Sequence, residues 1–551
     1  MTWLRRSYPI LFAAFPVLGV AARNPGYYHV SDALILAGIA AAATLIVFAG
    51  LWLVLRLRLP AARAADVAAF ATLVVVGAFY SYKPLALAGD YIRLNPRMGP
   101  ALVVAGLVAL VAAVLLAVRL RVHRRLPSMA DVSRFLTLTG SLVVVGALLQ
   151  LAYHGITATL AIRRSALVRE LARPVPARRV ASRGEPGAPP AVGGEPKRDV
   201  YVFVLDEFAD TDVLRERFGF DNRPFEDSLR ALGFTVPSSV RSNYANTLMS
   251  VSSFLNFAHT APLADVMSAK SNDFGPGAWL ISHNRTERFL KRRGYTVVFF
   301  RSSWYGPTQY NDGADERFDL DPGFHPGWDL QRSEIAAYLA AVTPVRFIMG
   351  HLPTAQEVHA RDVARTFAAV AEMPRDPRPT FSLAHVLSPH IPYIETADCK
   401  PLPRGATLWR DDSPAGRAAL ANQMRCVDHQ VLTTVRALIT RSDPKPIIIL
   451  QGDHGTQSLG IFESRKLPTT AQARERFQAF GAYYLPDGGA AVMPDSLTIV
   501  NVMRYVLGYY FHADLPPLPD TMYYSYWQSP YDLTPVDDDF HVVTTRADAE
   551  N

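Results

Sequence analysis

The chain has 551 residues, which is too long for one compact domain, so at least two parts are expected. Hydrophobic residues make up 50% of it, charged residues only 19%, and the formal net charge is +7. The positive charge gathers beside apolar segments and in residues 163–183, without the interleaved aromatic residues of nucleic-acid-binding modules, which excludes a nucleic-acid partner.

The N-terminal part, residues 1–155, is rich in Ala, Leu and Val and poor in acids. An apolar helix of about 20 residues crosses a bilayer. Five stretches have this character, namely residues 7–22, 33–55, 66–84, 101–118 and 135–153. The first contains Pro16, and a cleavable signal peptide is its alternative, although it lacks a convincing cleavage site and more spans follow. The sequence therefore predicts a transmembrane domain of about five helices.

Arginines are distributed unevenly between the two sides of these spans. They are frequent before the first span, between the second and third, and between the fourth and fifth, and they are scarce in the other loops. Since loops rich in Lys and Arg stay in the cytoplasm, everything after residue 155 is predicted outside. This is the orientation of a multi-pass bacterial inner-membrane protein with a periplasmic domain. No span carries an ionisable residue near its centre, which argues against a transporter.

Residues 156–198 form the predicted juxtamembrane segment and linker. Pro, Gly, Ala and Arg dominate after Ala172, as in flexible or semi-extended linkers. The part before Ala172 has the pattern of a short basic helix lying on anionic head groups.

Short β-rich runs alternate with helical stretches from residue 199 onward, which predicts an α/β layered domain over 199–515 and a C-terminal extension over 516–551. The strand candidates are mostly continuous and apolar, as in strands buried on both faces. They are residues 199–205, 296–301, 380–387, 446–451 and 480–485. The predicted helices include residues 211–218, 223–232, 248–257, 284–293, 332–342, 360–372 and 414–440.

The predicted helix 284–293 ends in Lys291, Arg292 and Arg293, and Gly294 follows as its cap. Cations at a helix C-terminus complement the helix dipole. This basic cluster is therefore interpreted as structural.

Two cysteines, Cys399 and Cys426, both lie in the outer domain. An extracytoplasmic location permits a disulfide between them, which would add roughly 3 kcal/mol in the chain-entropy model. Two free buried thiols are the alternative, because two cysteines alone do not establish their pairing.

Acidic and imidazole side chains follow two of the predicted strands. Asp206 and Glu207 come directly after the first strand, and Asp453 and His454 follow strand 446–451. Open α/β sheets bind ligands beyond the carboxyl ends of their strands, and carboxylates with imidazole suit Zn²⁺ or Mn²⁺ better than Ca²⁺. Taken singly, each pair has a structural alternative to metal binding. Asp206 and Glu207 could cap the following helix, and Asp453 and His454 could form a turn. Together the two pairs predict one metal site.

The segment 241–256, RSNYANTLMSVSSFLN, passes from a polar loop into a helical run at Thr247. The N–H groups and dipole of a helix N-terminus favour a phosphate or an oxyanion. A metal ion beside the threonine hydroxyl would lower its pKa and make it a nucleophile. The alternative is that Thr247 is only the N-cap of the helix.

The order of these pieces resembles the alkaline phosphatase superfamily: a strand with an acid at its end, a nucleophile about forty residues later, a histidine region and an Asp-His-Gly motif. Within it, the chain is most similar to membrane sulfatase-like proteins, lipoteichoic acid synthases and lipid A phosphoethanolamine transferases. The motifs cover residues 199–515. The resemblance implies a five-helix transmembrane bundle followed by an alkaline phosphatase-like α/β domain, with a mostly parallel central sheet flanked by helices.

The resemblance also implies roles for the site residues. Asp206 matches the metal ligand of the first strand, with Glu207 as second choice, and Asp453 and His454 match the paired ligands of the Asp-His-Gly motif. Thr247 matches the metal-bound threonine nucleophile of the transferases. The further ligand set of two-metal members is not found, so one divalent ion, Zn²⁺ or Mn²⁺, is expected.

The segment AHVLSPHIPY, residues 384–393, resembles the family segment whose histidines contact the transferred group or protonate the leaving group. His390 is the stronger candidate, because His385 lies inside an apolar strand, where a core role is the alternative.

The chain departs from sulfatases proper, which convert a Cys or Ser in the motif C/S-x-P-x-R. The nearest match starts at Cys399 and has Pro403 where the motif needs Arg, far downstream of Thr247. A true sulfate ester hydrolase is therefore not expected.

The expected function is a phosphotransferase that moves a phospholipid head group to a cell-envelope acceptor through a covalent intermediate on Thr247. Its partners are a phospholipid or envelope glycan and the membrane, and the sequence gives no oligomeric state. A phosphoric or sulfuric ester hydrolase of the same superfamily and a catalytically silent binding scaffold are the alternatives.

Overall fold

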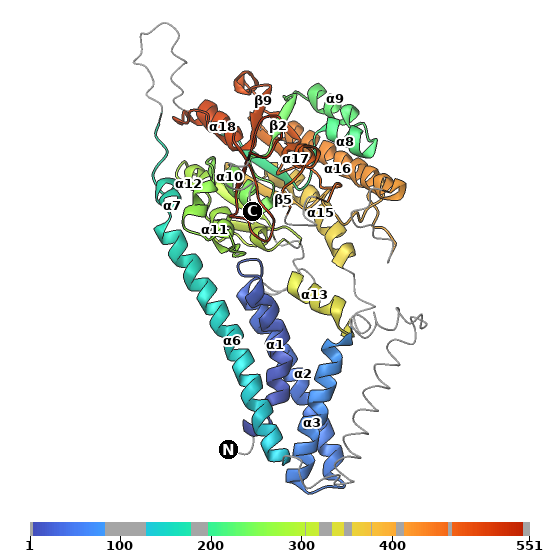
Figure 1. The fold of residues 1–551 in the computed structure, drawn as a ribbon. Helices are drawn as coiled ribbons and strands as arrows, with labels where there is room; N and C mark the ends of the chain where they lie inside the picture. Colours follow the sequence, from blue (N-terminus) through green and yellow to red (C-terminus); the bar gives the residue numbers. More distant parts are fainter. Residues whose placement is uncertain are drawn as a thin grey trace. The chain divides into compact units, whose positions relative to one another are not determined.

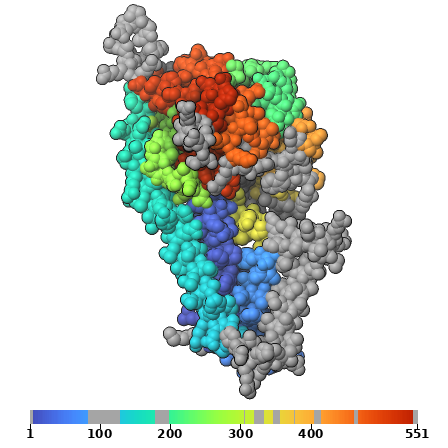
Figure 2. Space-filling model, in the orientation of Figure 1, coloured from blue at the N-terminus to red at the C-terminus, as the bar shows by residue number. Residues whose placement is uncertain are grey.

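The computed structural model describes residues 4–82, 128–177, 197–303, 305–318, 333–345, 355–375, 377–403, 413–460 and 466–543. The chain divides into two compact units (Figures 1 and 2). The first unit comprises Met1–Thr157 and His325–Ala355, and the second comprises Ala158–Phe324 and Gln356–Asn551.

The first unit is helical. Helices α2 (Val30–Arg56), α3 (Ala61–Tyr80) and α6 (Met129–Arg164) are long and apolar enough to cross a membrane, and α1 (Tyr8–Arg23) is a shorter apolar helix. They correspond to four of the predicted spans. The remaining one, residues 101–118, lies outside the described residues, so the number of five spans stays a prediction.

One helix of this unit comes from the middle of the chain. In α13 (Glu334–Val342), Ile335 packs in an apolar cluster with side chains of α1 and α2. Tyr27 donates a hydrogen bond of 3.1 Å to Glu334, and burial raises the pKa of that carboxyl to about 8. The helix predicted at 332–342 is therefore present, and it packs within the helical unit.

The second unit is built on a six-stranded sheet with the strand order β4-β3-β5-β1-β6-β8. Neighbouring strands run parallel, except for the antiparallel pair β6 and β8. The mostly parallel α/β sheet is thus confirmed, and the five predicted strands agree within one residue at each end. The six strands are β1 (Val200–Leu205), β3 (Thr296–Phe300), β4 (Glu316–Phe318), β5 (Thr380–Val386), β6 (Ile447–Gly452) and β8 (Gly481–Tyr484).

Helices flank the sheet because its central strands are buried on both faces. Tyr201, Phe203 and Leu205 on one face of β1 join a large apolar cluster with four helices. These are α8 (Thr211–Phe218), α9 (Arg223–Ala231), α15 (Ala355–Glu372) and α16 (Pro414–Arg441). Figure 1 shows α10 (Thr247–Asn256), α11 (Gly275–Ser282) and α12 (Arg285–Lys291) on the other side of the sheet from α15 and α16.

The remaining elements are short. A short helix is present before Ala172 as α7 (Ala166–Leu171), but it is not basic, because its charged residues are one arginine and one glutamate. Three helices that the sequence analysis missed are α11, α17 (Thr470–Phe477) and α18 (Val502–Phe511). The sequence analysis also missed two small sheets. One is three-stranded and consists of β7 (Gln478–Ala479), β2 (Ser239–Arg241) and β9 (Ser496–Thr498), and the other is the antiparallel pair of β10 (Met522–Tyr524) and β11 (Thr534–Val536).

The register of the parallel strands brings three chain segments to one edge of the sheet. Leu205 of β1 pairs with Val386 of β5 and with Gly452 of β6, so the residues that follow each strand lie side by side. Gly452 is required here, because a Cβ atom on it would lie 2.3 Å from the carbonyl oxygen of Phe208. The side chain of Asp206 is thereby placed beside that of Asp453.

Candidate active site

Thr247 is the first residue of α10, and its side chain does not cap that helix. Asn246 is the N-cap, since its side chain accepts a hydrogen bond of 3.0 Å from the N–H of Met249. The interpretation of Thr247 as an N-cap is therefore wrong. The Thr247 hydroxyl instead lies 2.9 Å from Nε2 of His454, and the residue as a whole is partly exposed.

Three buried side chains from three strand ends form a group that fits a metal ion. Asp206, His385 and Asp453 each offer one ligand atom, and these atoms all lie within 4.8 Å of one another. The three residues are only 2%, 3% and 1% exposed. Asp206 Oδ1, His385 Nε2 and Asp453 Oδ2 have no hydrogen-bond partner among the described residues. Buried polar atoms are normally satisfied, so a divalent cation bound here would supply what these atoms lack.

His385 is held with its Nε2 atom toward the two carboxylates. Its Nδ1 atom lies 2.7 Å from the hydroxyl of Thr308, which donates to Ser302, which in turn donates to the carbonyl of Tyr305. This direction of hydrogen bonds leaves Thr308 as the acceptor and Nδ1–H as the donor. Nε2 then carries a lone pair, as a metal-binding imidazole requires. The alternative of a satisfied core histidine is not supported.

Asp453 is fixed in a similar way. Its Oδ1 atom accepts backbone N–H groups from Glu207 at 3.2 Å and from His454 at 3.0 Å. The second carboxylate oxygen of Asp453, Oδ2, accepts no hydrogen bond from the described residues and can bind another partner. Burial, and next the charge of Asp206, raise the pKa of Asp453 well above its usual range. Burial also raises the pKa of Asp206, but His390, His385 and His454 outweigh it and lower that pKa overall. Two neighbouring buried carboxylates of this kind are best satisfied by a cation.

His454 borders the group. Its Nε2 atom lies 3.0 Å from Asp453 Oδ2, and its Nδ1 atom lies 3.2 Å from the carbonyl oxygen of Gly455. With Nδ1–H as the donor to that carbonyl, the lone pair of Nε2 faces Asp453 and Thr247. His454 thus contacts Asp453 and Thr247 but lies beside the group of three ligands and is not part of it.

Glu207 lies beside this group but has its own partners. It adopts a left-handed backbone conformation with φ of 60°, and its carboxylate accepts a hydrogen bond of 2.8 Å from Arg476 and another from Gln457. His390, which is half-buried, lies 3.8 Å from the same carboxylate oxygen. Both predicted residues therefore adjoin the cluster, with Glu207 in an ion pair rather than among the three unpartnered ligands.

Arg476 is a site residue that the sequence analysis missed. It lies in α17 and is 3% exposed. It donates to Glu207, to the carbonyl of Ala245 at 2.6 Å, and toward Nε2 of His454 at 3.0 Å. The helix has a detectable start, the capping box of Thr469 and Gln472, but no local pattern shows that Arg476 turns into the site.

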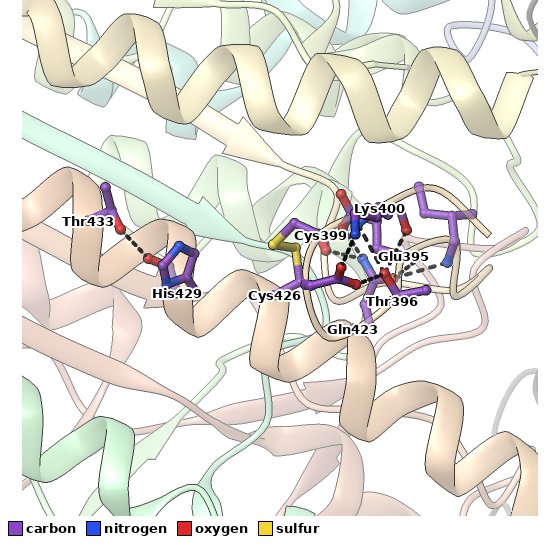
Figure 3. The surroundings of a disulfide bond; sticks show 11 residues. Glu395, Thr396, Cys399, Lys400, Gln423, Cys426, His429 and Thr433 are labelled. Carbon is purple, nitrogen blue, oxygen red and sulfur yellow. Dashed lines mark hydrogen bonds and ion pairs between the residues drawn. A yellow bond between two sulfur atoms is a disulfide. The ribbon is translucent and has the colours of Figure 1, made fainter.

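A disulfide joins the loop that follows His390 to α16. Figure 3 shows the bond between Cys399 and Cys426, so the alternative of two free thiols is wrong. Beside it, the Gln423 side chain accepts the N–H groups of Ile394 and Glu395 at 3.0 Å and donates to the Glu395 carboxylate at 2.9 Å. The loop is thus tied to α16 by one covalent bond and three hydrogen bonds.

Replacing Glu395 by glutamine is expected to flatten the pH dependence of stability. Burial raises the pKa of Glu395 from 4.5 to about 7. A raised carboxyl pKa means that the wild type loses stability as pH rises from about 4.5 to 7, by up to ~3 kcal/mol. Melting temperatures of both proteins at the two ends of this range test it. Asp398→Asn is the control, because that exposed carboxyl has a pKa of about 2 and does not titrate there. Parallel wild-type and Glu395→Gln profiles would contradict the prediction.

Comparison with known proteins supplies the family. The family model described as Sulfatase matches residues 207–505. No curated protein sequence matches this chain. Similar solved structures include the periplasmic domain of EcEptC from Escherichia coli in complex with Zn, with 11% identity, a TM-score of 0.38, and coverage of 59% of this chain and 84% of that one. The integral membrane protein lipooligosaccharide phosphoethanolamine transferase A from Neisseria meningitidis has 14% identity, a TM-score of 0.36, and coverage of 92% and 94%. Because the Sulfatase model covers more than half of the 551 residues, the chain belongs to the sulfatase family, as the order of its motifs predicted.

Proposed function

We propose that this protein is a metal-dependent phosphotransferase, anchored in a bacterial inner membrane, that moves a phospholipid head group to a cell-envelope acceptor. The main support is one arrangement: three unpartnered buried ligand atoms lie at a sheet edge beside the hydroxyl that begins α10. The apolar helices of the first unit support membrane anchoring. An enzyme and a lipid donor that share one membrane meet readily.

Asp206, His385 and Asp453 are the proposed metal ligands, with Thr247 and His454 completing the set. Mixed carboxylate and imidazole ligands suit Zn²⁺ or Mn²⁺. When bound, the cation lowers the pKa of a neighbouring hydroxyl and stabilises negative charge on a phosphoryl group. Glu207 and Arg476 are positioning residues in this proposal, since Arg476 donates to Glu207, to the carbonyl of Ala245 and toward Nε2 of His454.

In the first step the Thr247 oxygen attacks the phosphorus of the donor. A bond between phosphorus and this oxygen forms, and the bond from phosphorus to the leaving lipid oxygen breaks. The hydroxyl proton goes to water, because Thr247 is the solvent-accessible member of the group. The N–H groups at the start of α10 stabilise the phosphoryl oxygens, and His390 gives a proton to the leaving oxygen.

In the second step a hydroxyl of the acceptor attacks the phosphothreonine. A bond between phosphorus and the acceptor oxygen forms, and the bond between phosphorus and Thr247 breaks. The proton of the acceptor hydroxyl passes to His390, which lost one in the first step, and Thr247 regains a proton from water. If water attacks the phosphothreonine in place of the acceptor hydroxyl, the same residues catalyse hydrolysis of the donor.

Mass spectrometry of the full-length protein after incubation with membrane lipids tests the proposal. A head-group phosphate adduct on Thr247, in protein that contains Zn²⁺ or Mn²⁺, is the expected result. The adduct should disappear when a sugar acceptor is added and a phosphorylated sugar should appear. Release of free head-group phosphate alone would identify a hydrolase. Metal-free protein without an adduct would overturn the enzyme and leave a binding scaffold.

A further inference from the structure

A polar cavity lies in the second unit, between the residues that follow α7 and helix α12. Its volume is about 170 Å³, whereas a single water needs only about 10–15 Å³. Five arginines line it together with Leu171, Ala172, Pro174, Val175 and Phe289. They are Arg173, Arg285, Arg288, Arg292 and Arg293.

These arginines meet neutral partners only. Arg285 donates to the carbonyl of Arg173 at 3.5 Å, Arg288 to that of Leu171 at 3.1 Å, and Arg293 to that of Phe289 at 3.3 Å. In the part of the chain that the structure describes, none of the five forms an ion pair with a carboxylate. The buried Nε atom of Arg285 has no partner there at all. The cavity therefore concentrates positive charge, and no acidic side chain of the described residues lies within ion-pair distance of it.

The helix dipole explains only part of this cluster. Arg292 and Arg293 follow the C-terminal end of α12, where cations are favourable, but Arg285 is the first residue of that helix, where the dipole disfavours a cation. Burial lowers the pKa of Arg285 and of Arg288, and the Arg285 and Arg292 charges lower that of Arg288 further. The charge of Glu170 raises the pKa of Arg285 and that of Glu287 raises the pKa of Arg288, but neither carboxylate lies within ion-pair distance of these arginines. An anionic ligand would relieve the repulsion.

The cavity is separate from the proposed active site. Arg285 lies over the ring of Phe257 at 5.0 Å, and Arg504 donates to the Phe257 carbonyl at 2.7 Å. Phe257 follows the last residue of α10, whereas Thr247 begins it. A helix of this length places its two ends about 15 Å apart.

We propose that this arginine-lined cavity binds a phosphate ester, and that the head group of an anionic phospholipid supplies it. Guanidinium groups match phosphate oxygens with paired hydrogen bonds. The lining begins at Leu171, seven residues after the end of α6 at Arg164, and α6 contains the predicted span 135–153. The eleven residues of α6 beyond this span rise about 16 Å and the next seven reach at most about 25 Å, so the cavity is tethered within about 40 Å of the membrane, and a lipid phosphate is the source that we propose.

Native mass spectrometry of the full-length protein in detergent tests the proposal with the double variant Arg173→Gln/Arg292→Gln. Both side chains are exposed and make no hydrogen bond within the described residues, so the variant should fold. Its affinity for phosphatidylglycerol is expected to fall roughly tenfold, and phosphatidylcholine should bind the wild type more weakly. A thermal-shift titration with inorganic phosphate forms the second arm. Arg215→Gln/Arg230→Gln is the matched control, since it removes two exposed arginines from α8 and α9.

The outcomes are distinct and require no catalysis. Weaker binding of both phosphatidylglycerol and inorganic phosphate by the double variant alone supports the full proposal. A loss confined to inorganic phosphate supports a phosphate site and overturns the lipid as its source. Equal binding by the wild type, the variant and the control, or an equal loss in the control, overturns the site.

Discussion

Thr247→Ala is expected to abolish head-group transfer, with a loss of at least about 10³-fold in kcat, as for removal of a covalent nucleophile. The reason is chemical, because alanine offers no oxygen to attack the phosphorus. Folding should be preserved, since Asn246 and not Thr247 caps α10. Metal content should be largely preserved too, because the three unpartnered ligand atoms belong to other residues. The measurements are lipid turnover, melting temperature and bound metal.

Thr247→Ser is the matched variant for this prediction. It keeps the hydroxyl 2.9 Å from His454 and loses only a methyl group, so it should retain measurable transfer and still form the adduct. Transfer by the alanine variant at a rate near the wild type would rule out the covalent route.

Asp453→Asn is expected to lose the metal and, with it, activity, by at least about 100-fold in each. Asparagine keeps the shape and the carbonyl oxygen that accepts the N–H groups of Glu207 and His454. It replaces the unpartnered Oδ2 atom by an NH₂ group, which cannot bind a cation. Elemental analysis of purified protein and lipid turnover give the two measurements.

Asp453→Asn is also expected to change the melting temperature, upward in metal-free protein and downward in protein that contains metal. In metal-free protein, Asp453 and Asp206 form two neighbouring buried carboxylates, so the neutral variant should melt at a higher temperature than the wild type. With metal present the wild type should melt higher, because only it binds the ion tightly. Asp428→Asn is the control, a buried acid on α16 outside the cluster. Full metal content in Asp453→Asn would remove Asp453 from the ligand set.

Local patterns in the sequence predicted the main strands and several helices, and they pointed to candidate site residues at two strand ends and one helix start. Continuous apolar runs predict strands buried on both faces, and all five predicted strands are present. Ligands bind beyond the carboxyl ends of parallel strands, and this rule predicted that Asp206 and Asp453 lie close together. The polar-to-helical change at Thr247 predicted its place at a helix start. These inferences work because each depends on a few neighbouring residues and on the geometry of regular elements.

Other features depend on contacts between distant parts of the chain, and only the tertiary structure decided them. Arg476 reaches Glu207 across 269 positions, and no pattern near either residue shows it. The position of His385 inside an apolar strand suggests a core residue. Only the structure shows that the Thr308 hydroxyl, 2.7 Å from its Nδ1 atom, orients its ring. The pairing of Cys399 with Cys426 and the packing of α13 in the helical unit also follow from chain folding. Sequence periodicity determines which face of an element is buried, but which distant side chain meets it there is determined by packing alone.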